Sequence, residues 1–297
     1  MTSEGVTSPH AELEARARLG RWLVMSTVAG SGAGHVGGPL SAMDLLVALY
    51  FRVLDVRVEE PAWADRDRFI LSKGHSAIGL YAVMAQRGYF PIAELATFDK
   101  GDSRLQGHPD MTRLPGLDAS TGSLGQGLAV GVGIALGARL RGRDFRTYVM
   151  LGDGECQEGM VWESVQVAAR YRLGNLIAIV DHNGLQQYGW PLGDEPDARG
   201  DRSEPFPGDT LRGIFDGFGW RVLEVDGHDF EAIISACADA GEAAAGSRPT
   251  VILARTIKGR GLSFTEGRHA WHARVPTADE LEAARLELGI DASGQPE

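Results

Sequence analysis

Apolar runs typical of strands alternate with apolar positions at helical spacing along this chain. The run 147–151, rich in apolar and β-preferring residues, predicts a short strand, and the uninterrupted apolar run 176–180 predicts a strand that is buried on both faces. Between them, apolar residues recur at helical spacing from 158 to 171. A crossover of this length has room for a helix, so we expect the two strands to be parallel. The stretch 147–189 therefore predicts a strand–helix–strand unit that ends in a polar loop.

The same patterns continue on both sides of this unit. Further strands are expected within 65–72, 220–225 and 249–255, and further helices over 11–28, 77–86, 128–138, 230–245 and 278–288. The segment after His35, GGPLSAMDLLVALYF, is expected to form a helix that Ser41 caps. This order predicts an α/β fold with a mostly parallel central sheet and helices on both faces.

The domain organisation follows from the length and from the position of the polar segments. A chain of 297 residues is long enough for one large domain to bury its own core. We expect a mobile tail at 1–10, a single domain over 11–288 and a trailing tail at 289–297. The segment 186–213 is long, irregular and proline-containing, which is typical of a functional or disordered loop.

Composition narrows the class of partner. The formal net charge is −11, which argues against nucleic acid or an anionic membrane as the main partner. The longest nearly apolar run, 128–138, is too short to span a bilayer, and the first ten residues lack the pattern of a secretory signal. Cys156 and Cys237 make no disulfide framework, and Cys156 is interpreted as a packing residue. These features favour a cytoplasmic protein that acts on small molecules.

Two polar residues follow the strands of the central unit. Asp153 and Asn183 come just after 147–151 and 176–180, where open α/β sheets bind ligands. A carboxylate and a side-chain amide supply the oxygen ligands that Mg²⁺ prefers, with positions left for water and phosphate oxygens. Glycines on both sides of Asp153 let the backbone approach a diphosphate closely. The alternative is a turn acid and a loop asparagine in an ordinary α/β protein.

Short motifs in this region resemble a known family. The sequence GDGECQEGMVWE followed by NLIAIVDHN is similar to the thiamine diphosphate motif of transketolases. The motifs SKGH, QGHPD, TGSLGQG, VDGHD and KGRG occur in the order that this family has, and the similarity runs from about residue 13 to 288. It implies a three-layer thiamine diphosphate-binding fold.

The resemblance implies a cofactor site at the end of the central unit. Asp153, Asn183 and the backbone carbonyl of Leu185 would hold Mg²⁺ or Ca²⁺ against the cofactor diphosphate. Gly152 and Gly154 would lie beside it. In the family the cofactor acts as an electron sink, while protein groups hold it and move protons.

Histidines supply the second group of candidates. Four of the eight directly follow a glycine, which lets a loop bring the ring to a ligand; for any one of them the alternative is a loop histidine bonded to backbone. The resemblance implies that His35, His75 and His108 line the cofactor thiazolium and the hydroxyl groups of the donor, with His75 nearer the diphosphate. His272 matches a late family histidine that contacts diphosphate and substrate, and His269 matches less well. His228 is interpreted as structural.

A glycine loop and two acids complete the predicted site. By resemblance the loop at Gly122, Ser123 and Leu124 would offer backbone groups to the aminopyrimidine. Glu158 and Glu163 match acids of a proton relay between the two active sites of a dimer. As acids near a helix N-terminus they would also stabilise the helix dipole by about 0.3–1 kcal/mol each, and the two roles are compatible.

The resemblance to transketolases covers only their amino-terminal part. Full-length transketolases continue into pyrimidine-binding and carboxy-terminal domains, so the chain is expected to be the amino-terminal subunit of a two-chain enzyme that pairs with a carboxy-terminal subunit in an α2β2 heterotetramer. The expected reaction is two-carbon ketol transfer from a ketose (phosphate) donor to an aldose acceptor. The alternatives are thiamine-dependent two-carbon or acyl transfer in a biosynthetic pathway, or a non-catalytic regulatory homologue. Two local departures are the charged segment 186–213 and Ala273, which replaces the family's glycine.

Overall fold

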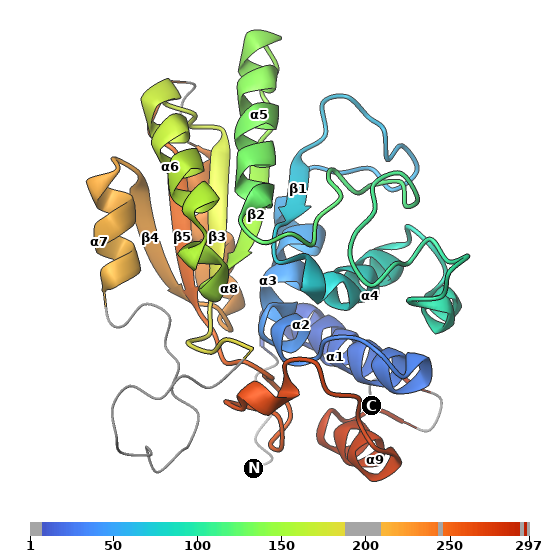
Figure 1. Ribbon diagram of the computed structural model, residues 1–297. Coiled ribbons are helices and arrows are strands. Elements are labelled where there is room, and N and C mark those ends of the chain that lie inside the picture. The colour runs from blue at the N-terminus through green and yellow to red at the C-terminus, as the bar shows by residue number, and fades with distance from the viewer. Residues whose placement is uncertain (1–7, 188–208, 243–245, 292–293, 296–297) are drawn as a thin grey trace, which may run out of the picture.

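A parallel five-stranded sheet forms the centre of the computed structural model, which describes residues 8–187, 209–242, 246–291 and 294–295 (Figure 1). The strand order is β1-β2-β3-β5-β4, and every neighbouring pair is parallel. The strands are β1 (Arg68–Leu71), β2 (Thr147–Gly152), β3 (Leu176–His182), β4 (Arg221–Asp226) and β5 (Thr250–Arg255). All of the strands expected from the apolar runs are present.

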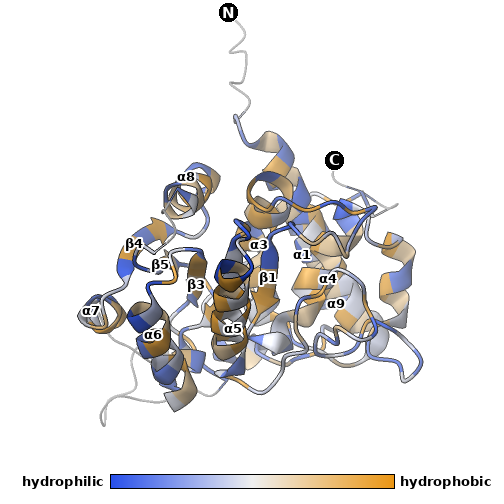
Figure 2. Ribbon diagram, turned by 90° about the horizontal axis from the view of Figure 1, so that it is seen from above, coloured by the Kyte–Doolittle hydropathy of each residue, from blue (hydrophilic) through white to orange (hydrophobic). Residues whose placement is uncertain are grey.

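Helices cover both faces of this sheet. They are α1 (Ala11–Ser31), α2 (Gly37–Ser41), α3 (Met43–Ala48), α4 (Ala77–Arg87), α5 (Gln126–Leu140), α6 (Gly159–Tyr171), α7 (Thr210–Gly217), α8 (Phe230–Gly241) and α9 (Ala278–Glu287). Seen along the strands, α5, α6 and α7 lie on one side of the sheet and α8 and α3 on the other (Figure 2). The predicted three-layer α/β architecture is confirmed.

The continuous apolar run in β3 is explained by these two layers. Ile177 and Ile179 join the core cluster formed with α1, α3, α4 and α8. Ala178 and Val180 join the cluster formed with α5, α6 and α7. Since side chains alternate along a strand, covering both faces of β3 makes its residues 176–180 uniformly apolar.

Local sequence signals set the packing and the ends of several helices. An added Cβ at Gly131 of α5 would lie 2.4 Å from Val149 Cγ2, so the small residue permits close packing on β2. Asp229 caps α8 by accepting hydrogen bonds from two backbone N–H groups of its first turn. Thr277 and Glu280 form a reciprocal capping box at the start of α9. The caps at Asp229 and Thr277 fix where α8 and α9 begin without relying on core packing.

Three expectations from the sequence need correction. Ser41 does not cap a helix: it lies inside α2, and its hydroxyl donates to the Gly38 carbonyl and to Asp181. The irregular segment 186–213 contains the start of α7, whereas 188–208 lie outside the described residues. The predicted boundary at 288 is too early, since Ile290 is 1% exposed and belongs to the core.

Of the predicted tail at 1–10, residues 1–7 lie outside the described residues, and His10 Nε2 lies 3.1 Å from Glu231 Oε2. Cys156 and Cys237 are both buried and unpaired, which agrees with a packing role. Among the helices that the structure describes, none is both long and apolar enough to cross a membrane.

Candidate functional site

A cavity of about 510 Å³ lies at the carboxyl ends of four neighbouring strands. Because the strands are parallel, the residues that follow β1, β2, β3 and β5 converge on one edge of the sheet. The lining residues include His35, Gly38, Lys73, His75, Gly122, Leu124, Asp153, Glu158, Asn183, Leu185, Gln186, Lys258 and His272. Most of the residues predicted from the sequence therefore lie in one pocket.

The structure brings the three predicted metal ligands together. The register pairs Gly152 with Asp181, so Asp153 lies beside the loop that follows β3. Asp153 Oδ2 accepts a hydrogen bond from the Gly184 backbone N–H at 2.6 Å. In the same turn the Leu185 N–H donates to Asn183 Oδ1 at 3.1 Å. One carboxylate, one amide oxygen and one backbone carbonyl thus lie on adjoining segments.

The chemistry of this donor set fits a hard divalent cation. Asp153 is 2% exposed, and burial together with the nearby charge of Asp181 raises the pKa of Asp153 to about 6. A bound cation would compensate such a carboxylate. Within the described part of the chain, no group of three or more His, Cys, Asp or Glu side chains could hold a metal. A cation at this edge would therefore need the amide and carbonyl oxygens besides Asp153.

A buried ion pair lies directly under the pocket, and sequence reasoning missed it. Lys73 Nζ donates to Asp181 and, at 3.2 Å, to the carbonyl oxygen of Gly38. Asp181 also accepts hydrogen bonds from Ser41 and Thr256. Burial alone would raise the pKa of Asp181, but Lys73 and these hydrogen bonds lower it below its ordinary value. The charged carboxylate therefore joins the ends of β1, β3 and β5 to α2.

Three histidines line the cavity, and a fourth, His108, lies beside them without being one of the lining residues. The ring centroids of His35, His75 and His272 are 5.0–5.2 Å apart, and His108 lies 6.2 Å from His35. Burial, with neighbouring positive charges, lowers the pKa values of His35 and His75 and lowers that of His272 to about 3. These three rings are therefore neutral in this arrangement and can donate or accept hydrogen bonds.

Lys258 faces the same space from the loop after β5. Its Nζ lies 2.9 Å from the Gln186 carbonyl, 3.3 Å from the Leu185 carbonyl and 3.0 Å from His272 Nδ1. Burial and the charge of Lys73 lower the pKa of Lys258 to about 8. Two buried lysines beside neutral imidazoles give this wall an attraction for anions. In the sequence this lysine is marked only by the KGRG motif, to which the resemblance assigns no role.

The glycine loop lies against the histidine group. Gly122 has φ +151°, and an added Cβ there would lie 3.0 Å from the His108 ring, so only glycine allows this approach. Leu124 lines the cavity, whereas Ser123 is exposed and is not one of the lining residues. His108 is itself exposed at the rim.

Glu155 anchors this loop and was also missed. Its carboxylate is 3% exposed and accepts hydrogen bonds from the Ser72 hydroxyl at 2.5 Å and from the backbone N–H groups of Gly125 and Gly152. It therefore joins the ends of β1 and β2 to the glycine loop. Its position in the GDGE motif was the available signal.

The two predicted relay acids have different positions. Glu158 lines the cavity at the start of α6 and is exposed. Glu163 lies further along α6, exposed and away from the lining residues. His269, in a short turn before His272, is likewise not among the lining residues.

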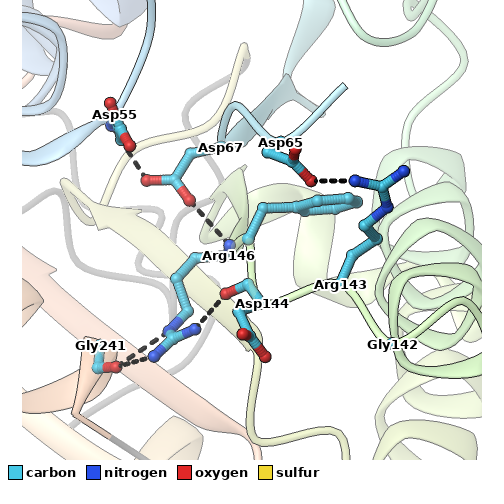
Figure 3. A pocket seen from close by; sticks show the side chains of 9 residues that line it. Asp55, Asp65, Asp67, Gly142, Arg143, Asp144, Arg146 and Gly241 are labelled. Carbon is cyan, nitrogen blue, oxygen red and sulfur yellow. Dashed lines mark hydrogen bonds and ion pairs between the residues drawn. The ribbon is translucent and has the colours of Figure 1, made fainter. Parts of the chain in front are cut away.

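A second pocket of about 510 Å³ lies at the opposite, amino-terminal edge of the sheet (Figure 3). Several of its charged groups are bonded to protein partners: Asp67 accepts from the backbone N–H groups of Asp55 and Arg146, and Arg143 pairs with Asp65 at 2.6 Å. Arg146 also donates to the Gly241 carbonyl at 2.9 Å. These contacts link the start of β2 to α8 and to the turn before β1.

Comparison with known proteins identifies the family. The profile of the family described as "Transketolase, thiamine diphosphate binding domain" matches residues 13–295. The chain is 40% identical over 93% of its length to the 6-deoxy-6-sulfo-D-fructose transketolase subunit of Clostridium sp., of which it covers 96%. It is 36% identical to an apulose-4-phosphate transketolase subunit of Phocaeicola vulgatus, covering 93% of both chains.

Solved structures show the same fold. The transketolase of Pichia stipitis in complex with sedoheptulose-7-phosphate superposes with a TM-score of 0.85 at 30% identity. The match covers 95% of this chain and 41% of that one. The transketolase of Campylobacter jejuni gives a TM-score of 0.83 at 28% identity and is covered to 43%. This chain therefore spans about two fifths of these longer transketolases.

Proposed function

This chain belongs to the transketolase family, and we propose that it is the amino-terminal subunit of a two-component, thiamine diphosphate-dependent transketolase. The proposed reaction transfers a two-carbon ketol unit from a ketose donor to an aldose acceptor. The observation that carries the proposal is the pairing, in one cavity, of the oxygen donors Asp153, Asn183 and Leu185 with the basic wall at Lys258. The oxygen donors suit the Mg²⁺ ion and the basic wall suits the diphosphate, so a magnesium diphosphate would use both.

The oxygen donors would hold Mg²⁺ or Ca²⁺, and the Gly152 and Gly154 backbone would lie beside the diphosphate. Gly154 supports this arrangement, since an added Cβ there would lie 3.3 Å from Gln186 and narrow the cavity. When bound, thiamine diphosphate supplies the electron sink for cleaving the donor carbon–carbon bond. Gly122, Ser123 and Leu124 would present backbone groups to its aminopyrimidine.

The histidines are assigned to substrate and proton handling. His75 and His272 lie on the Lys73 and Lys258 side of the cavity and would face the diphosphate. His35, between them and His108, would contact donor hydroxyl groups, and His108 at the rim would exchange protons with the substrate. Neutral imidazoles suit both roles because each ring has one donor and one acceptor nitrogen.

The partner would be a carboxy-terminal transketolase subunit that carries the pyrimidine-binding domain, in an α2β2 heterotetramer. The relatives that this chain matches over nearly their whole length are named as subunits. A row of exposed apolar side chains on α5 and α6 offers a surface for that partner: Val130, Met160, Val167 and Tyr171, each 37–45% exposed. Met160 directly follows the first residue of α6, beside the cavity-lining Glu158, and Glu163 lies on the same helix, where a relay between active sites would pass.

The donor is proposed to be a ketose that bears an anionic group. The named relatives act on a sulfonated ketose and on a sugar phosphate, which share a terminal anion. A screen of ketose donors and aldose acceptors with the reconstituted pair would identify both substrates. Transfer only to an acceptor that is not a sugar would instead favour a biosynthetic role.

Reconstitution tests the proposal. The chain alone should transfer no ketol unit, and addition of the partner, sought as the product of the adjacent reading frame, should restore turnover. Efficient transfer by the rigorously purified chain alone would contradict the two-component assignment. Calorimetry that detects no uptake of thiamine diphosphate with Mg²⁺ by the pair would contradict the cofactor assignment.

A further inference from the structure

Three buried polar residues from separate elements form a cluster behind the cofactor pocket. Arg21 of α1 donates two hydrogen bonds to the carboxylate of Asp44 of α3, at 2.6 and 3.0 Å. The Nδ1 atom of His228, in the turn between β4 and α8, lies 2.7 Å from the same carboxylate. The side chains of all three are 7–9% exposed. Through these bonds the cluster contacts none of the residues that line the pocket.

The outer atoms of this cluster hold both ends of one short loop. His228 Nε2 accepts a hydrogen bond from the backbone N–H of Ile257 at 2.9 Å. Arg21 Nε donates to the Arg260 carbonyl at 2.9 Å. Between these two points lies Lys258, whose ammonium group reaches into the pocket. The loop 257–260 is therefore fixed on both sides of its functional residue.

The backbone at this loop approaches the cluster closely. An added Cβ at Gly261 (φ +98°) would lie 2.7 Å from Arg21 Cδ. One at Gly227 would lie 2.4 Å from Thr256 Cγ2. The motifs VDGHD and KGRG thus contribute glycines where side chains would force the loop away. The lysine stem is confined too, because an added Cβ at Gly37 would lie 3.0 Å from Lys258 Cγ.

We propose that Arg21, Asp44 and His228 are positioning residues that fix the loop 257–260 and thereby place the Lys258 ammonium group in the cofactor pocket. The hydrogen-bond pattern defines the form of the histidine that does this. A backbone N–H can only donate, so Nε2 of His228 is the acceptor and Nδ1 carries the hydrogen that is donated to Asp44. Only the name of the ligand in the pocket rests on the proposed function; the placement of the loop does not.

Two substitutions at His228 separate its hydrogen bond to Asp44 from its hydrogen bond to Ile257. In His228→Asn the amide reaches the position of Nδ1 and can still donate to Asp44, but the acceptor for Ile257 is lost. In His228→Gln the amide oxygen reaches the position of Nε2 and can still accept from Ile257, but the donor to Asp44 is lost. Both remove the ring and are similar in polarity, so each serves as the control for the other.

Hydrogen exchange of the full chain without cofactor tests the positioning directly. The Ile257 amide should exchange about tenfold faster in His228→Asn, since one hydrogen bond is lost, and close to the wild-type rate in His228→Gln. Amides of α8 should exchange alike in both. Equal rates at Ile257 in the two variants would overturn the proposal.

A double-mutant cycle with Lys258→Met then tests whether the effect passes through the lysine. Affinity for thiamine diphosphate with Mg²⁺ is measured by calorimetry on the chain with its partner subunit. His228→Asn should weaken binding about tenfold in the wild-type background and cause no further loss beside Lys258→Met. Additive losses would show that His228 acts elsewhere and would overturn the inference. If the wild-type pair takes up no cofactor, the proposed function fails, and hydrogen exchange alone decides the positioning.

Discussion

The two edges of the central sheet carry pockets of equal volume, about 510 Å³ each, whose charged groups are arranged differently; Figure 3 shows the pocket at the amino-terminal edge. At the amino-terminal edge, acids and arginines bond to one another or to backbone. At the carboxyl edge, Asp153 has a raised pKa, while Lys258 and His272 have lowered ones. Burial also raises the pKa of Asp67 at the amino-terminal edge, so a shifted pKa does not by itself distinguish the two pockets. What distinguishes them is their lining: the carboxyl edge places a buried carboxylate, Lys258 and imidazole rings around one cavity, whereas Asp67 is held by two backbone N–H donors.

The largest effect is expected from removing the carboxylate at the carboxyl edge. Asp153→Ala should abolish cofactor retention, a loss of about 10²-fold or more, because it removes the charged ligand of the divalent cation. Calorimetric titration of the subunit pair with thiamine diphosphate and Mg²⁺ measures this. The matched control is Asp65→Ala at the other edge. A variant at 153 that holds cofactor as tightly as the wild type would refute the metal assignment.

The cluster of Arg21, Asp44 and His228 behind the carboxyl edge should make the stability of the fold depend on pH. Burial by itself would raise the pKa of Asp44, but Arg21 and His228 hold it below its ordinary value of 3.8. A depressed carboxylate pKa stabilises the fold above the unfolded pKa, and this contribution is lost as pH falls through the folded pKa. Asp44→Asn should therefore cost about 3–5 kcal/mol of unfolding free energy at pH 7.

The difference between wild type and Asp44→Asn should narrow as pH is lowered below 3.8. Urea denaturation of both proteins at pH 7 and pH 3 provides the measurement. An equal difference at the two pH values would mean that the carboxylate charge is not what stabilises the cluster.

Substitution of His108 should affect turnover more than it affects cofactor affinity. His108→Ala is expected to slow turnover about 10²-fold through loss of proton exchange with the substrate, with a smaller change in cofactor affinity. Steady-state kinetics of the reconstituted pair, combined with calorimetry, distinguish the two effects. Loss of cofactor as the main effect would reassign this residue to the diphosphate.

At the amino-terminal edge a substitution should affect stability alone. Asp67→Asn leaves one of the two backbone N–H groups, those of Asp55 and Arg146, without its acceptor. We expect a loss of about 1–2 kcal/mol in unfolding free energy and an unchanged cofactor affinity. Weakened cofactor binding would show that the two edges are coupled through the sheet.

The smallest effect is expected at the exposed pair of the same pocket. Arg143 and Asp65 are 46% and 49% exposed, so solvent screens their attraction. Arg143→Ala should change the unfolding free energy by less than about 0.5 kcal/mol. Thermal denaturation at low and high salt checks this, and a clear loss of stability would show that the pair stabilises this edge of the sheet.

Local pattern in the sequence predicts the sheet and places Asp153 and Asn183 after neighbouring strands, whereas Leu185 enters only through the resemblance to transketolases. Apolar runs located every strand, and one strand–helix–strand unit was enough to place Asp153 beside the loop of Asn183. Groups that pair over long distances could not be predicted in this way. Lys73 and Asp181 are 108 positions apart in the chain, and no periodicity links them.

The same limit explains the wrong interpretation of Ser41. Its type and position suit a helix cap, but its hydroxyl bonds to the buried carboxylate of Asp181, 140 positions away, which no local rule reveals. The sequence offers Lys258 only as part of the KGRG motif, since its burial depends on contacts such as the close approach of Gly37 to its side chain. Tertiary contacts therefore determine the roles of Ser41 and Lys258, which local sequence pattern does not reveal.

Strand β3 carries the carboxylate beneath the pocket and leads directly into the residue whose amide lies at the pocket wall. Asp181 and Asn183 are two positions apart, and the pairing of Gly152 with Asp181 fixes their height relative to Asp153. A slip of one position along this ladder would send the Asp181 side chain to the opposite surface of the sheet and would displace the turn at Asn183. The spacing of the oxygen ligands is thus inherited from the backbone ladder inside the core. A variant that deforms β3 at Ile177, far from any ligand, should change which cation is preferred.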